Sequence, residues 1–487
     1  IDLRTSMPAI KGGNGLRNLA QEVSQLSNRS LQIFLIFLAA FCAITIRNVY
    51  LSSGFSFLTG DEPHYLVAAR SIAEFHSLEM TKAYDNVRSQ LPWFPSVLPQ
   101  NERHVLQGLH GWYLGHGLGL PFLLAVPYVT AGPLGSLFVI SFFSALAVVY
   151  VYRTTRKIVD EHTALATTFL MGFASLILPF SNQIYPEPVF AFLLIYSTYQ
   201  TFFGAEKLQD LVVTGFMFGF SAWLKLNFSL AMAPLMIYLV VANRKNLLRE
   251  LSLTVPVAAL VGLLGYYNLL AFGNPFMIVP QNTPASLSFM KWWVTPLFDR
   301  YNGLVVFWPL VLLTPLGFIP LFSRAPSLAA ATLWPVLVLY VSAASFIGTA
   351  LVEHYPARFL VPAFPTLAIF LASSIASKKR SFLFEVALFI LSYFSLQFST
   401  SIAWNRAVGL TSQNLTGKSE LLRHVYFGFE GFFPTFAEGM HLTNYAVTAI
   451  ILSLLGLMVC KDALRLCHNA WFCRRQLGEK DNGPRTS

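Results

Sequence analysis

Long apolar runs recur along this 487-residue chain and decide its predicted architecture. A helix needs about 20 apolar residues to cross a bilayer, and these runs are continuous rather than alternating, which favours helices over transmembrane strands. The block 211–242 is too long for one crossing and is interrupted by "WLKLN", so we interpret it as two short helices with Lys225 at the turn. We therefore predict an all-α polytopic membrane protein with about twelve crossings, within a range of roughly 10–13. The other predicted crossings are 31–47, 134–152, 163–180, 186–203, 251–271, 304–322, 328–349, 359–376, 382–400 and 445–460.

One further apolar segment, 117–132, decides which side of the membrane each loop occupies. It contains two prolines, and if it crossed the membrane the basic cluster "YRTTRK" would share a side with the acidic pair Asp61-Glu62. Because basic residues favour the cytoplasm, we interpret 117–132 as a juxtamembrane or re-entrant helix on the outer face. Both termini and the clusters "YRTTRK", "NRKNLLR", "SKKRS" and "CRR" are then cytoplasmic.

This topology divides the chain into an arm, a membrane domain and a tail. The first extracytoplasmic loop is long and is expected to carry juxtamembrane helices, which is unusual for a plain bundle of crossings. The expected parts are a cytoplasmic arm 1–30, a transmembrane domain 31–460 with extracytoplasmic loops 48–133, 272–303 and 401–444, and a basic cytoplasmic tail 461–487.

Composition agrees with a surface that lipid covers. Charged residues make up only 11% of the chain, against about 25% in soluble proteins. The formal net charge of +10 fits cytoplasmic loops, and no aromatic-basic platform suggests a nucleic-acid partner. None of the four cysteines falls in the long outer loops, so we expect neither a structural disulfide nor a zinc site.

The stretch "FLTGDEPHYLVAARS" places two acids directly after the first predicted crossing. Asp61 could cap a helix that begins at Pro63, with Glu62 in its first turn. A carboxylate held at a helix start outside the membrane also suits a general base. We assign that role to Asp61, with Glu62 as its partner or as a metal ligand. His64 and Tyr65 are expected to contact substrate, although either could simply pack at the interface.

Other charged residues lie at apolar boundaries that the topology puts on the same face as Asp61. Lys225 could snorkel to the interface, but a compact cation with three donors also suits an external phosphate. Arg358, in "VEHYPARF", could bind phosphate through two nitrogens or pair with Glu353. Glu187, in "YPEPVF", would orient a sugar hydroxyl, neutralise Lys225 or serve only as a first-turn charge of its helix.

We interpret two histidines in "LHGWYLGHGLGLP", His110 and His116, as structural residues or as residues that face the sugar. They are distant in sequence from other ligand types, so we do not predict a metal there. His354, in the same motif as Arg358, is a further candidate for substrate contact. Together these residues describe an outer rim with a base beside phosphate-binding cations, above apolar helices.

In their order, these motifs resemble the GT-C superfamily of glycosyltransferases that use polyprenyl-phosphate sugars, a group that includes protein O-mannosyltransferases and aminoarabinose transferases. The resemblance runs from about residue 34 to 402 and is carried by the order of short motifs rather than by any one of them. These motifs are "GDEPHYLVAARSI", "GHGLGLPFLLAVPY", "YPEPVF", "WLKLNFSLAMAPL", "FGNPF", "LFDRYNGLVVFWPLVLL" and "HYPARFLVPAFP".

The resemblance implies an inverting hexosyl- or pentosyltransferase that moves sugar from a polyprenyl-phosphate donor to a hydroxyl of a protein, lipid or glycan. It implies that Asp61 is the catalytic base with Glu62 beside it, and that Lys225 and Arg358 lie near the carrier phosphate. It also implies a multi-pass protein of the plasma (inner) membrane, or of the endoplasmic reticulum in a eukaryote. No nucleotide is needed, and we favour a site without metal, although a divalent cation, Mg²⁺ or Mn²⁺, at Asp61 and Glu62 is left open.

Two other functions fit the same residues. A transporter or flippase of polyprenyl-linked sugar would need charges along a central path, and a hydrolase would use water as the acceptor. Release of carrier phosphate together with transfer of the sugar to a hydroxyl acceptor distinguishes the transferase from both.

Overall fold

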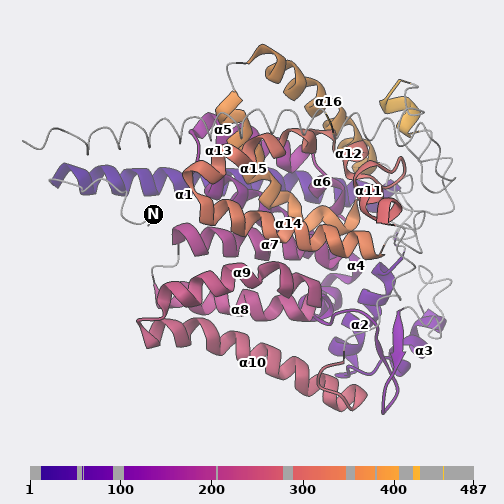
Figure 1. The fold of residues 1–487 in the computed structure, drawn as a ribbon. Helices are drawn as coiled ribbons and strands as arrows, with labels where there is room; N and C mark the ends of the chain where they lie inside the picture. The colour runs from indigo at the N-terminus through magenta and orange to yellow at the C-terminus, as the bar shows by residue number, and fades with distance from the viewer. Residues whose placement is uncertain are drawn as a thin grey trace, which may run out of the picture.

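The fold is known from a computed structural model, which describes residues 13–51, 58, 60–90, 104–204, 207–277, 289–346, 357–378, 381–404, 421–427 and 453. Helices make up nearly all of it (Figure 1). Several predicted features lie outside these residues: most of the 401–444 loop, nearly all of the 445–460 crossing, the tail 461–487 and the beginning of the arm.

The first half of the chain contains several short helices, a small sheet and the long helix α4. A two-stranded antiparallel sheet, which an all-α prediction did not include, pairs Val105 with Leu114. The elements are α1 (Gly13–Leu51), α2 (Glu62–Glu74), α3 (Thr81–Gln90), β1 (Val105–Gln107), β2 (Trp112–Leu114), α4 (Gly119–Thr155), α5 (Glu161–Phe173), α6 (Ile177–Phe180), α7 (Pro186–Tyr199) and the π-helix η1 (Gln200–Gly204).

The second half is a series of apolar helices joined by short turns. It consists of α8 (Leu208–Leu224), α9 (Leu226–Asn243), α10 (Leu247–Phe272), α11 (Phe289–Phe298), α12 (Leu304–Phe307), the 3₁₀ helix η2 (Pro309–Leu313), α13 (Pro315–Arg324), α14 (Pro326–Phe346), the 3₁₀ helix η3 (Arg358–Ala363), α15 (Phe364–Lys378) and α16 (Phe382–Trp404).

Among the described residues, seven helices are long and apolar enough to cross a membrane, and the predicted count of twelve is not confirmed. Two predicted crossings are divided into shorter pieces. The segment 304–322 contains α12, η2 and α13, because Pro309 and Pro315 lack the N–H groups that would continue one helix. The segment 163–180 is split between α5 and α6. The polytopic helical prediction itself is confirmed.

The proline-containing segment 117–132 is helical, as the sequence suggested. It forms the first part of α4 and is separated from the rest of that helix by a break. α4 runs from Gly119 to Thr155, but Ala131 and Gly132 leave the helical region, and Gly132 has φ +60°. A positive φ suits glycine, which lacks the Cβ that would clash. The break separates the first part of α4, residues 119–130, from the part that follows Gly132.

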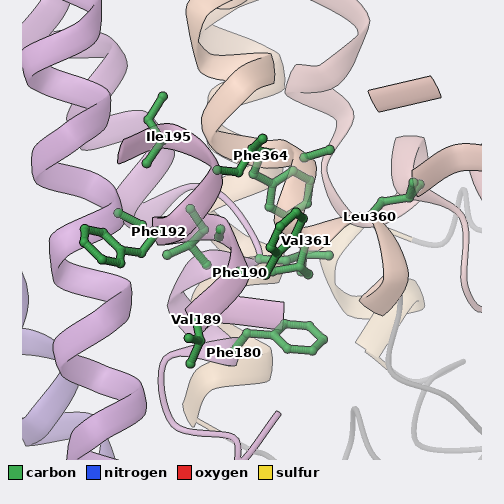
Figure 2. Packing of buried hydrophobic residues seen from close by; sticks show 14 of the residues in the cluster. Phe180, Val189, Phe190, Phe192, Ile195, Leu360, Val361 and Phe364 are labelled. Atoms are coloured by element: carbon green, nitrogen blue, oxygen red, sulfur yellow. The ribbon is translucent and has the colours of Figure 1, made fainter. Parts of the chain in front are cut away.

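The centre of the bundle is α7, in which all 14 residues are buried. Phe190 stacks on Phe228 of α9 with ring centroids 4.0 Å apart. On another side of α7 the residues of η3 and the start of α15 pack against it (Figure 2). Because α7 is buried along its whole length, the loop before it is attached to a fixed element. That loop forms part of the site described below.

The short elements α2, α3, β1 and β2 gather at one end of the long helices (Figure 1). Figure 1 shows α2, α3 and the small sheet beside the end of α10, away from the N-terminal end of α1. Main-chain bonding joins them: Leu109 N–H donates to the carbonyl of Ala271 at 2.8 Å. The carboxylate of Glu79 accepts the N–H of Trp112, which ties the start of α3 to β2. The two strands are therefore fixed against both α3 and the bundle.

A close helix contact provides a test of this packing. A Cβ added at Gly317 of α13 would lie 1.8 Å from the carbonyl oxygen of Phe370 in α15, whereas one at Gly262 of α10 would meet nothing within 4 Å. We expect Gly317→Ala to destabilise the protein by about 1–3 kcal/mol. The matched variant Gly262→Ala should be neutral or stabilise by up to about 1 kcal/mol. Thermal unfolding of the detergent-purified variants measures both effects, and equal midpoints would contradict the α13–α15 packing.

Candidate active site

Asp61 lies immediately before α2, but its side chain does not cap that helix. Its backbone is helical and its carboxylate accepts no hydrogen bond from the helix N-terminus. The structure therefore does not support the capping interpretation. Pro63 starts the helix, since its missing N–H costs nothing in the first turn. The carboxylate of Asp61 is consequently directed towards other segments of the chain.

Arg358 is the centre of a buried ion cluster. Its Nη2 donates to Oδ2 of Asp61 at 2.7 Å and its Nε donates to Oε1 of Glu187 at 3.3 Å. The guanidinium also lies over the ring of Tyr185, 3.7 Å from its centroid. The side chain of Arg358 is only 5% exposed. The guanidinium of Arg358, at the start of η3, thus joins the residue before α2 to the first turn of α7. These three places are far apart in sequence.

Lys225 completes the cluster from the turn between α8 and α9. Its backbone is extended, so it separates the two half-helices as predicted. Its Nζ donates to Oε1 of Glu187 at 2.7 Å, and the side chains of Lys225 and Glu187 are only 9% and 1% exposed. Glu187 therefore neutralises Lys225, one of the roles the sequence suggested. The structure brings Asp61, Glu187, Lys225 and Arg358 together in one place.

Glu62 faces a different way from Asp61. It is fully buried, and its Oε1 accepts the main-chain N–H of Ile184 at 2.7 Å. Successive helical residues point about 100° apart, so neighbours in sequence do not share a face. Glu62 fixes α2 to the loop before α7 rather than lying beside the carboxylate of Asp61.

Two histidines that flank the small sheet approach Asp61. His104 precedes β1 and His116 follows β2, and Gly115 N–H donates to the carbonyl of His104 at 2.7 Å. His104 Nδ1 and His116 Nε2 are 3.1 Å apart, and they lie 3.6 and 3.8 Å from Oδ1 of Asp61. His104 was not among the predicted residues. The structural interpretation of His116 did not anticipate its position.

A signal for this pair was present in the sequence. Two short apolar runs separated by a turn that contains glycines, as in "VLQGLHGWYL", indicate a β-hairpin. An antiparallel pair places the residues before its first strand beside those after its second. Recognising the hairpin would have brought His104 and His116 together.

Two other predicted residues, His64 and Tyr65, pack against the histidines that approach Asp61. His64 stacks on His104 with centroids 3.9 Å apart, and its Nδ1 lies 2.5 Å from the hydroxyl of Tyr84. Tyr65 is fully buried with its ring 5.4 Å from that of His116. Its hydroxyl has no hydrogen-bond partner among the described residues. His354 lies outside the described residues.

Electrostatics keep Asp61 ionised. Burial alone would raise the pKa of its carboxyl, but the Arg358 guanidinium, with contributions from His116 and His104, holds that pKa well below its usual range. Burial lowers the pKa of His116 to about 4, although the charge of Asp61 opposes this. At neutral pH the site therefore holds a carboxylate beside an uncharged imidazole.

The same three side chains are the described residues best placed to hold a metal ion. One ligand atom each from Asp61, His104 and His116 lies within 4.8 Å of the others. Glu62 does not belong to this group, so the structure does not place the two adjacent acids as a ligand pair. Two imidazole nitrogens and a carboxylate oxygen suit a transition-metal ion better than Mg²⁺.

The buried ion cluster predicts a large effect on stability. In Arg358→Gln, Asp61 and Glu187 lose a shared counter-charge inside the protein, and breaking a buried pair costs roughly 3–5 kcal/mol. In the control Arg29→Gln, the lost partner is Glu161, and both side chains are substantially exposed, so we expect a cost of about 0–1 kcal/mol. Thermal unfolding in detergent compares the two. Equal losses would show that the cluster does not stabilise the fold.

Comparison with known proteins gives one family match. Residues 132–267 match the family model described as dolichyl-phosphate-mannose-protein mannosyltransferase. This segment contains Glu187 and Lys225, whereas Asp61 and Arg358 lie outside it. None of the curated proteins compared with the sequence matches it.

Two solved structures are similar over much of the chain. The oligosaccharyltransferase of Archaeoglobus fulgidus in the apo form is 16% identical with a TM-score of 0.41, over 80% of this chain and 56% of that one. This chain thus spans little more than half of the archaeal protein. ArnT from Cupriavidus metallidurans, bound to undecaprenyl phosphate, is 11% identical with a TM-score of 0.42, over 90% of this chain and 78% of that one. The family match over residues 132–267 agrees with the predicted resemblance, which includes the protein O-mannosyltransferases.

Proposed function

We propose that this protein transfers a sugar from a polyprenyl-phosphate donor to an acceptor hydroxyl, with inversion at the anomeric carbon. The observation that carries the proposal is the 2.7 Å ion pair between the carboxylate of Asp61 and the buried guanidinium of Arg358, in a protein built of long apolar helices. A lipid-borne phosphate needs both parts of this arrangement. Its tail requires an apolar environment, and its head requires buried positive charge.

Lys225 and Arg358 are proposed to bind the donor phosphate. An ammonium has three donors, and within the described residues Lys225 uses one of them, on Glu187. The remaining donors are available to phosphate oxygens. Glu187 is buried between the two cations and holds them 2.7 and 3.3 Å from one oxygen, so it sets their spacing. We propose that Glu187 positions these cations rather than contacting the sugar.

Asp61 is proposed as the general base. It accepts the proton of the acceptor hydroxyl, whose oxygen attacks the anomeric carbon as the bond from that carbon to the phosphate oxygen breaks. The leaving phosphate keeps the electron pair, and Arg358 and Lys225 stabilise its charge. A single displacement inverts the configuration, and its transition state has oxocarbenium character. We propose that Glu62, His64 and Tyr65 position α2 and the sheet around this base.

The site is proposed to face the extracytoplasmic or lumenal side. Arg29 lies at the opposite end of the first predicted crossing from Asp61, and Arg244 lies at the opposite end of α9 from Lys225. Basic residues of this kind favour the cytoplasm. The protein would then be a multi-pass enzyme of the plasma (inner) membrane, or of the endoplasmic reticulum in a eukaryote, with cytoplasmic termini.

The sugar and the acceptor are left at the level of class. The donor is a hexosyl or pentosyl polyprenyl phosphate, and the acceptor is a hydroxyl of a protein, a lipid or a glycan. A transporter of the same lipid is the second function. The ionised residues named above gather at one end of the helices rather than along a path through them, which favours transfer.

The test is turnover of a polyprenyl-phosphate sugar by the purified full-length chain, measured as carrier phosphate released and as sugar joined to the acceptor. Asp61→Asn keeps the size of the side chain but removes the base, so we expect turnover to fall by at least roughly 10²-fold. The control Asp85→Asn changes an exposed acid of α3 and should be unaffected. Undiminished turnover in Asp61→Asn would exclude Asp61 as the base, and lipid movement without bond cleavage would identify a transporter.

A further inference from the structure

Asp61, His104 and His116 direct one ligand atom each at a common point. The three separations are 3.1 Å between the imidazole nitrogens and 3.6 and 3.8 Å from these nitrogens to Oδ1 of Asp61. An ion bound tetrahedrally at about 2.0–2.1 Å holds its ligand atoms roughly 3.3 Å apart. The observed triangle therefore has nearly the dimensions of one face of a tetrahedral site.

Direct hydrogen bonding explains only one side of that triangle. The two imidazole nitrogens are close enough to bond to each other, but the two distances to Asp61 exceed those of hydrogen bonds. A carboxylate oxygen that lies just beyond hydrogen-bonding distance of two imidazole nitrogens suits a cation shared by all three atoms. The carboxylate can hold it without losing Arg358, because Oδ1 faces the histidines and Oδ2 faces the guanidinium.

The surrounding structure fixes these ligands and leaves them reachable. His104 is stacked on His64, which Tyr84 holds in turn, and the paired strands β1 and β2 place His116 beside it. Side chains of His104 and His116 keep 17% and 16% of their surface exposed. Such orientation by a second layer of contacts is typical of metal sites.

We propose that Asp61, His104 and His116 bind one divalent transition-metal ion of the Zn²⁺ type. Imidazole selects such ions over Mg²⁺, which prefers an all-oxygen octahedral environment. Three protein ligands leave a fourth position open, and we assign it to an oxygen of the substrate. The ion's part in sugar transfer rests on the proposed function, but its binding does not.

Cobalt provides a direct probe, because tetrahedral Co²⁺ absorbs strongly in the visible region whereas hydrated Co²⁺ does not. The full-length protein, purified in detergent and stripped with a chelator, should bind one equivalent of Co²⁺ with a tetrahedral spectrum. Zn²⁺ should displace it and Mg²⁺ should not. We expect His104→Ala and His116→Ala to weaken binding at least roughly tenfold. The control His110→Ala changes an exposed histidine of the same hairpin and should bind like the wild type.

A second variant keeps the test independent of folding defects. His116→Cys retains a metal ligand, so it should still bind Co²⁺ and add the near-ultraviolet charge-transfer band of a thiolate bound to cobalt. The proposal is overturned if folded wild-type protein shows no tetrahedral spectrum, if the two alanine variants bind as it does, or if the cysteine variant shows no thiolate band.

Activity measurements separate this inference from the proposed function. A protein that binds the ion but never releases carrier phosphate would leave the metal site standing and refute the transferase. A protein that transfers sugar at the wild-type rate after complete removal of metal would leave the transferase standing and refute a substrate-binding ion.

Discussion

The arrangement of this site depends on one buried guanidinium. Arg358 contacts Asp61 from the segment before α2 and Glu187 from α7, and through Glu187 it is linked to Lys225 between α8 and α9. A buried charge is tolerated only when partners compensate for its lost hydration. Each of these four residues therefore requires the others. The requirement makes four distant stretches of sequence meet at one point.

The same contact has a consequence for chemistry. The guanidinium that holds Asp61 in place also holds the pKa of its carboxyl low, so that the base is ionised at neutral pH but only weakly basic. A weak base suffices when the leaving group carries much of the charge in the transition state and is itself stabilised by cations. Arg358 and Lys225 are placed for that task. The proposed metal ion would supply the remaining activation of a substrate oxygen.

Much of this could be predicted from the sequence. Charged residues at apolar boundaries are costly, and for that reason all four members of the ion cluster stand out as candidates in the sequence itself. Their pairing was not predicted in full. Pairing of Glu187 with Lys225 was one of three alternatives, whereas the contact between Arg358 and Asp61 joins residues 297 positions apart, and no local pattern encodes it.

Three other features of the structure differ from the sequence predictions because of local backbone geometry. Glu62 was grouped with Asp61 because they are adjacent, whereas the helix turns its side chain towards Ile184. His104 and His116 meet only through the register of a two-stranded sheet, which the apolar periodicity of a helical protein conceals. The crossing predicted at 304–322 rested on hydropathy alone, and its prolines divide it into shorter helices.

The central claim is that Lys225 and Arg358 hold the phosphate of a polyprenyl lipid beside Asp61. Mass spectrometry of lipid that co-purifies with the intact protein tests this most directly. The account predicts polyprenyl phosphate on the wild type and on the control Lys82→Gln, an exposed lysine of α3, and its loss from Lys225→Gln and from Arg358→Gln. A wild-type protein without that lipid, or the same lipid on all four proteins, would contradict it.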